Sequence, residues 1–153
     1  MGSMFQKLTR LFNKPPHLQV GALCLRKNRG QTEVLLISSL GTGRWIIPKG
    51  WPMRGKSLAA AAQQEAWEEA GVNGAIQPKS IGCYHYMKER DNGLAIYCEV
   101  QVFVLTVKRL REDHPEAGRR KLRWVSPEEA AALVGEPGLK RLIAGVDRHF
   151  PLK

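Results

Sequence analysis

The sequence predicts a single α/β (α+β) domain in which a mixed β-sheet is sandwiched between helices. Three observations support this fold class. The chain has 153 residues, a length that suits one domain with one core. Its patterns run in the order strands, helix, strands, helix, without regular strand–helix alternation. No repeat or low-complexity linker divides it. We therefore expect an N-terminal extension over residues 1–16 and one domain over residues 17–153.

The N-terminal extension predicts a short amphipathic helix over residues 4–14, packed on the domain. Its apolar stripe consists of Phe5, Leu8, Leu11 and Phe12, with basic residues opposite. A membrane-surface anchor is the alternative. Pro15 and Pro16 end this helix, and residues 1–3 are typical of residues left by cloning.

Apolar runs predict the strands of the sheet. Some alternate with polar residues, as in a half-buried strand, whereas residues 33–38 form a continuous run that indicates burial on both faces. The predicted strands cover residues 17–25, 33–38, 44–47, 81–86, 94–107 and 121–125.

Helix signals occur at three places. Residues 57–70 are rich in alanine, begin at a serine suited to the N-cap, and are followed by Gly71, a good C-terminal cap. Residues 126–129 form a capping box with proline at the first helical position. A third amphipathic segment, 138–150, closes the chain.

Composition excludes several protein classes. Hydrophobic residues make up 43% and charged residues 25%, which excludes disordered, collagen-like and disulfide-dense chains. The chain contains no run of about 20 apolar residues, so we expect no membrane span.

The three cysteines form no C-x-x-C pair, so we expect small core side chains rather than zinc or redox motifs. Without an apolar signal segment, the expected compartment is the cytoplasm. The net charge of +10 favours anionic partners.

Three glutamates gather near the end of the alanine-rich helix. At about 100° per residue, Glu69 falls about 40° from Glu65, and Glu68 about 60° on the other side. Like charges at this spacing repel, and they lie at the end of the helix dipole that disfavours carboxylates. A bound divalent cation such as Mg²⁺ would compensate both effects. A solvated acidic face is the alternative.

The loop before this helix, residues 48–56, holds two glycines and three basic residues near a helix N-terminus, a combination that suits anions. It lacks the spacing of a P-loop. From Gly50 to Val72 the chain resembles the Nudix box, G-x5-E-x7-R-E-U-x-E-E-x-G-U with U apolar. The matching positions are Gly50, Glu65, Ala66, Glu68, Glu69, Gly71 and Val72. Lys56 stands in place of the family's glutamate, and Gln64 in place of its arginine.

The resemblance extends over most of residues 17–135. Residues 34–50 and 118–130 are similar to the subgroup of diphosphoinositol polyphosphate and diadenosine polyphosphate hydrolases. This resemblance implies the Nudix fold and Mg²⁺- or Mn²⁺-dependent hydrolysis of a diphosphate linkage in a polyphosphorylated small molecule. Nucleoside diphosphate derivatives or RNA 5′ ends are alternative substrates, and a catalytically weak phosphate-binding module is a further alternative.

The resemblance also implies roles for individual residues. Glu65, Glu69 and Glu68 would bind metal, and Glu68 would be the general base, with Glu116 as the second candidate. The expected substrate contacts are Ser38, Ser39, Arg44, Lys49, Gly50, Arg90, Arg119 and Arg120. The sequence contains no helix-turn-helix, RNA-recognition or zinc signature, so nucleic acid is not an expected partner. Monomer and homodimer both remain open.

Overall fold

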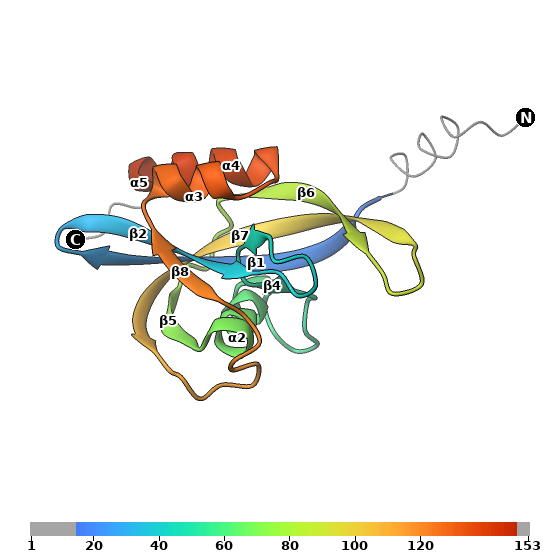
Figure 1. The fold of residues 1–153 in the computed structure, drawn as a ribbon, viewed down its shortest axis with the longest axis horizontal. Coiled ribbons are helices and arrows are strands. Elements are labelled where there is room, and N and C mark those ends of the chain that lie inside the picture. Colours follow the sequence, from blue (N-terminus) through green and yellow to red (C-terminus); the bar gives the residue numbers. More distant parts are fainter. Residues whose placement is uncertain (1–14, 150–153) are drawn as a thin grey trace, which may run out of the picture.

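In the computed structural model, helices cover both faces of a large mixed sheet (Figure 1), which confirms the predicted fold class. The structure describes residues 15–149. The predicted helix over residues 4–14 therefore lies outside the described residues. Within 15–149, no helix has the length and apolar character needed to cross a membrane.

The sheet has eight strands, and its central path runs β3-β2-β1-β7-β5. β1 and β7 pair in parallel, and the other pairs are antiparallel. β4 pairs with β1, β6 with β7, and β8 with β2. The strands are β1 (His17–Asn28), β2 (Gln31–Ser38), β3 (Trp45–Ile46), β4 (Lys49–Gly50), β5 (Val72–Ile76), β6 (Gly82–Glu89), β7 (Ala95–Leu110) and β8 (Leu122–Val125).

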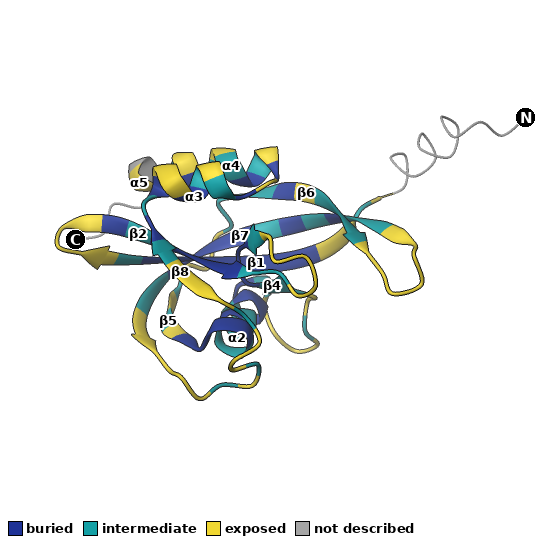
Figure 2. Cartoon of the chain, viewed as in Figure 1, coloured by how far each residue is buried: buried dark blue, intermediate teal, exposed yellow. Residues whose placement is uncertain are grey.

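Helix α2 (Leu58–Ala70) covers one face of the sheet, and α3 (Pro127–Leu133) and α4 (Pro137–Ala144) cover the other, followed by α5 (Val146–His149) (Figure 1). An apolar cluster lies under each layer, and the strands that face both layers are buried in Figure 2. In β2, Val34 and Leu36 face α3 and α4, whereas Leu35 and Ile37 face α2. This explains the continuous apolar run in the sequence.

Helix α2 begins and ends where the sequence predicts. The Ser57 side-chain oxygen accepts a hydrogen bond from the backbone N–H of Ala60 at 3.1 Å. Gly71 ends the helix with a φ of 70°, and a Cβ there would lie 2.2 Å from the carbonyl oxygen of Arg111. Glycine is thus required both by the backbone conformation and by the loop packed against it.

Several details differ from the sequence-based expectations. Two strands were not predicted: the two-residue β4 lies within the expected loop 48–56, and β5 is short, with Gly74 interrupting its apolar pattern. The predicted helix 138–150 is divided into α4 and α5 at Gly145, whose backbone N–H bonds to carbonyl groups of α4. Cys24 and Cys98 are buried as expected, but Cys83 is only partly buried, so its interpretation as a core side chain was wrong.

Candidate active site

A cluster of carboxylates surrounds one buried arginine beside α2. Arg120 Nη2 lies 3.3 Å from Glu69 Oε1 and 3.6 Å from Glu116 Oε1. Its other terminal nitrogen donates to the carbonyl oxygen of Ser38 at 3.1 Å. The Arg120 and Glu69 side chains are each 8% exposed. The arginine therefore holds a helix residue, a loop residue and the end of β2 together.

The strand segment before α2 meets the same carboxylates through its backbone. The Lys49 N–H donates to Glu69 Oε2 at 3.1 Å. A Cβ on Gly50 would lie 2.3 Å from the carboxyl carbon of Glu65, so only glycine lets this carboxylate approach the backbone. Gly50 thus lies against a predicted metal ligand.

The environment disfavours ionised carboxylates at this site. Burial raises the pKa of Glu65 to about 7, and the negative charges of Glu69 and Glu68 add to the effect. Burial likewise raises the pKa of Glu69 to about 7, although Arg120 and Lys49 partly oppose the shift. Such crowding favours a cation among these groups.

Glu68 lies at the edge of this cluster. Its carboxylate accepts a hydrogen bond from Gln64 Nε2 at 3.1 Å. Its carbonyl oxygen accepts the N–H of Glu116 and the Nδ1–H of His114, each at 3.0 Å. These bonds fix the loop after β7 against the end of α2. They explain how Glu116, distant in the sequence, comes to lie beside the helix.

A groove of about 590 Å³ begins next to the cluster, between the β2–β3 turn and the β6–β7 hairpin. Lys49 connects the two, because its backbone bonds Glu69 while its side chain lines the groove. The Lys49 ammonium lies 4.9 Å from the centre of the Tyr86 ring. Four basic residues line the groove against two acidic ones: Arg44, Lys49, Lys88 and Arg90 against Glu89 and Asp91.

The predicted substrate contacts divide between the groove and its surroundings. Ser39, Arg44, Lys49 and Arg90 line the groove. The Ser38 hydroxyl oxygen instead accepts the backbone N–H of Lys121 at 2.8 Å. Arg119 is exposed on the loop before β8, and Arg120 lies within the carboxylate cluster.

Sequence reasoning did not single out Tyr86 and Lys88, which line the groove, or Glu136, which contacts Arg44. Tyr86 and Lys88 follow the alternation that starts at buried Tyr84, so period-two reasoning along β6 could have found them. Glu136, the N-cap residue of α4, lies 3.6 Å from Arg44. Its other carboxylate oxygen is buried and has no hydrogen-bond partner. No sequence pattern indicated that contact.

The NUDIX domain family model matches residues 15–146. The chain belongs to the Nudix family. Among its relatives, mouse diphosphoinositol polyphosphate phosphohydrolase 3-alpha is 32% identical over 114 residues, covering 73% of this chain and 65% of that protein. Nudix hydrolase 12, mitochondrial, of Arabidopsis thaliana is 31% identical over 115 residues, covering 72% and 56%. The chain spans about half the length of the curated plant relatives it matches.

Solved structures share the fold at low sequence identity. The C. elegans Ap4A hydrolase superposes with a TM-score of 0.66 and 18% identity, over 88% of this chain and 98% of that one. The NUDIX domain of Shewanella oneidensis NrtR, solved with ADP ribose, gives a TM-score of 0.64 and 15% identity, over 96% and 98%. These similarities confirm the Nudix fold.

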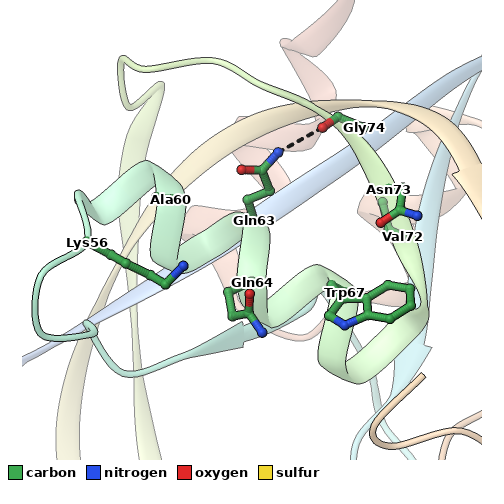
Figure 3. A pocket seen from close by; sticks show the side chains of 8 residues that line it. All are labelled: Lys56, Ala60, Gln63, Gln64, Trp67, Val72, Asn73 and Gly74. Atoms are coloured by element: carbon green, nitrogen blue, oxygen red, sulfur yellow. Dashed lines mark hydrogen bonds between the residues drawn. The ribbon is translucent and has the colours of Figure 1, made fainter.

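The two departures from the Nudix box meet in one hollow of about 390 Å³ between α2 and β5 (Figure 3). Lys56 and Gln64 both line it, beside Trp67. Gln63, one residue earlier, bonds the carbonyl oxygen of Gly74 at 2.8 Å and so ties α2 to β5. Because Gln64 also bonds Glu68, an uncharged amide contacts this glutamate in place of the box arginine.

Proposed function

We propose that this Nudix domain hydrolyses a phosphoanhydride linkage in a highly anionic substrate, with Mg²⁺ or Mn²⁺ as cofactor. Candidate substrates are dinucleoside polyphosphates and inositol pyrophosphates. The observation that carries the proposal is the position of Lys49, which joins the carboxylate cluster to the basic groove. A diphosphate held at this junction would meet metal ligands and cationic side chains at once.

The donor set fits a hard divalent cation. Glu69 supplies a buried carboxylate, Glu65 supplies a half-buried one, and Glu68 is the third expected ligand. Mg²⁺ typically takes one or two carboxylates, with waters and substrate phosphates completing its shell. When bound, the cation supplies charge neutralisation at the phosphoryl oxygens. Arg120 would keep Glu69 and Glu116 oriented toward the site.

A general base would take the proton from the attacking water, and carboxylates are the groups that surround this site. Glu68 is our first candidate, since within residues 15–149 the neutral Gln64 is the one side chain that hydrogen-bonds its carboxylate. Glu116 is the second candidate, because Arg120 holds it beside Glu69. Lys49, Lys88 and Arg90 would bind the distal phosphates, and Ser39 and Arg44 would contact the substrate across the groove.

Substrate class is inferred from charge and from relatives. The net charge of +10 and the basic groove favour a polyphosphate over a substrate with few charges. The names of relatives and structural neighbours include diphosphoinositol polyphosphate and Ap4A as substrates. Nucleoside diphosphate derivatives and RNA 5′ ends remain alternative substrates, and a structural neighbour bound to ADP ribose supports the former. The cytoplasmic location stays a prediction.

A phosphate-binding module with weak activity is the second candidate function. Two observations favour it: Lys56 replaces an acidic box residue, and the neutral Gln64 contacts Glu68 where the box has arginine. Such a protein would bind polyphosphates in the groove and release little product.

An activity assay separates the two functions. The purified chain is incubated with pooled phosphoanhydride substrates and Mg²⁺ or Mn²⁺, beside Glu68→Gln and Glu69→Gln. Glu128→Gln, an exposed residue on α3, is the matched control. We expect phosphate or nucleotide release by the wild type and the control only. Release no greater than that of the two site variants would instead support the binding module.

A second assay compares kcat/KM for diadenosine polyphosphates, inositol pyrophosphates, capped RNA and ADP-ribose. We expect one of the first two to be preferred, with a steep loss of affinity as ionic strength rises. A preference for ADP-ribose or capped RNA would contradict the proposed substrate class while leaving the hydrolase assignment intact.

A further inference from the structure

A group of side chains of the types that can bind metals lies on the β6–β7 hairpin, outside the carboxylate cluster. One ligand atom each from Cys83, His85 and Glu99 lies within 4.8 Å of the other two. His85 Nε2 and Glu99 Oε1 are 3.1 Å apart. Among the residues that the structure describes, no other three histidine, cysteine or acidic side chains meet so closely.

Strand pairing brings these residues together. Cys83 and His85 are two positions apart on β6, so both side chains point to one face of the sheet. β7 pairs antiparallel with β6 and places Glu99 directly opposite His85. Directly opposed residues of such a pair have Cβ atoms about 5 Å apart, and diagonal neighbours are still within reach. The backbone register therefore fixes the group without any loop.

Neighbouring side chains hold two of the three ligands in place. Gln101 Nε2 donates to Glu99 Oε2 at 3.0 Å, and Ser80 Oγ donates to Gln101 Oε1 at 2.9 Å. The His85 ring stacks on Tyr97, with centroids 5.4 Å apart and planes at 15°. One oxygen of Glu99 is thus fixed by an amide while the other faces His85. Supporting contacts of this kind are typical around metal ligands.

We propose that Cys83, His85 and Glu99 form a binding site for Zn²⁺. Zinc prefers sulfur and nitrogen ligands, and three protein ligands leave its fourth tetrahedral position to water or another ligand. At the bond lengths usual for zinc, ligand atoms in a tetrahedral site lie roughly 3.5 Å apart, so small side-chain shifts would close this group around an ion. Mg²⁺ would not compete strongly, because it requires oxygen ligands.

A bound ion would join the two strands of the hairpin that lines the groove. Lys88 and Arg90 lie farther along the same hairpin, whose tip extends beyond the helices in Figure 1. The backbone N–H of Arg90 bonds the carbonyl oxygen of Leu94 at 2.8 Å near that tip. Zinc would therefore stabilise the pairing of β6 with β7 beneath these basic residues. This inference is independent of the proposed function.

Cobalt substitution tests the site directly. Co²⁺ is titrated into the reduced protein with Mg²⁺ in large excess to occupy oxygen-only sites, and the near-ultraviolet thiolate-to-cobalt band is recorded. We expect one Co²⁺ per chain to give this band, and one equivalent of Zn²⁺ to remove it by displacement. Binding to the α2 carboxylates gives no such band, because they contain no sulfur.

Variants assign the signal to the three residues. We expect Cys83→Ser to lose the band and His85→Ala and Glu99→Gln to weaken cobalt uptake at least tenfold. His17→Ala is the matched control, since His17 is exposed on β1 and its strand partner on β7 is Cys98, next to Glu99. Circular dichroism verifies folding, and His85 is exposed, so its variant should fold. An absent band in the wild type, or a band that survives Cys83→Ser, would overturn the proposal.

Discussion

The α2 carboxylate cluster and the β6–β7 group differ in both ligand chemistry and compactness. The α2 cluster offers carboxylate oxygens as ligands, and its Glu69 is buried. Arg120 forms ion pairs with Glu69 and Glu116 and so neutralises part of the negative charge of the cluster. The β6–β7 group offers sulfur, nitrogen and oxygen within 4.8 Å, and His85 is exposed. Among the described residues, no three carboxylates of the α2 cluster form such a group.

The ion expected at each of these two sites follows from the type and spacing of its ligands. A compact group of three mixed donors suits a tetrahedral zinc ion. A wider set of carboxylates leaves room for an octahedral ion that keeps its waters and also contacts a diphosphate. The compact mixed-donor group therefore fits the proposed zinc ion, and the α2 cluster fits an ion shared with substrate.

The largest expected effect concerns the base at the α2 site. We expect Glu68→Gln to lower kcat by about 10²–10⁴-fold, the usual contribution of a general base, and Glu116→Gln to lower it less. Steady-state kinetics at saturating Mg²⁺ measure kcat for both variants. Were Glu116→Gln the more severe change, Glu116 would be the base. Small losses in both would contradict a glutamate base at either position.

Close packing against Glu65 predicts the next effect. Gly50→Ala places a methyl group where the Glu65 carboxylate lies, so we expect kcat/KM to fall tenfold or more. Gly135→Ala is the control, because a Cβ there meets nothing nearer than Arg44 Nη1 at 3.9 Å. Equal activities of the two variants would show that the position of Glu65 does not matter.

How far the sequence predicts this site depends on distance along the chain. The α2 glutamates follow from helical periodicity between Ser57 and Gly71, and the structure places them as expected at the end of α2. Arg120 was predicted only as a substrate contact. Its pairing with Glu69, 51 positions away, depends on the path of the loop before β8, which no local pattern reveals.

The mixed-ligand group was missed for a related reason. The absence of C-x-x-C pairs argued against zinc motifs, but such rules capture only ligands on one local segment. Here β6 supplies two residues and β7 the third, and their meeting depends on strand register. Alternation along each strand is readable from the sequence, whereas the register between two strands is not.

The raised pKa values of Glu65 and Glu69 predict how the stability of the metal-free protein changes with pH. Folding raises the carboxyl pKa of Glu65 and Glu69 from 4.5 to about 7, so the folded, metal-free chain holds protons that the unfolded chain releases. The protons that the folded chain holds on these two carboxyl groups stabilise it relative to the unfolded chain. This stabilisation is fully present below about pH 4.5 and is lost as pH rises through about 7.

Thermal unfolding of the metal-free chain between pH 4.5 and 7.5 measures this effect. We expect Glu69→Gln to become more stable relative to the wild type as pH rises, because the variant has no charge to bury. Saturating Mg²⁺ should reduce the difference at pH 7.5. A wild type that gains stability relative to Glu69→Gln over this interval, without metal, would contradict the assigned shifts.

The smallest effect is expected at the tip of the hairpin. Arg90 is exposed, so we expect Arg90→Ala to raise KM for a polyphosphate several-fold with little change in kcat. The rise in KM should be smaller at high salt, because salt screens the interaction of Arg90 with the phosphates. Arg29→Ala, on the β1–β2 turn, is the control for loss of a surface charge. Steady-state kinetics at two ionic strengths measure both. A fall in kcat alone would contradict a binding role for Arg90.

The most direct measurement is calorimetric titration of the zinc-free chain with Mn²⁺ at pH 7.5, for the wild type, Glu69→Gln and Cys83→Ser. We expect Mn²⁺ uptake by the wild type and by Cys83→Ser, and at least a tenfold weaker uptake by Glu69→Gln. Uptake that is unchanged in Glu69→Gln, or absent from the wild type, would contradict a divalent-cation site at the α2 carboxylates.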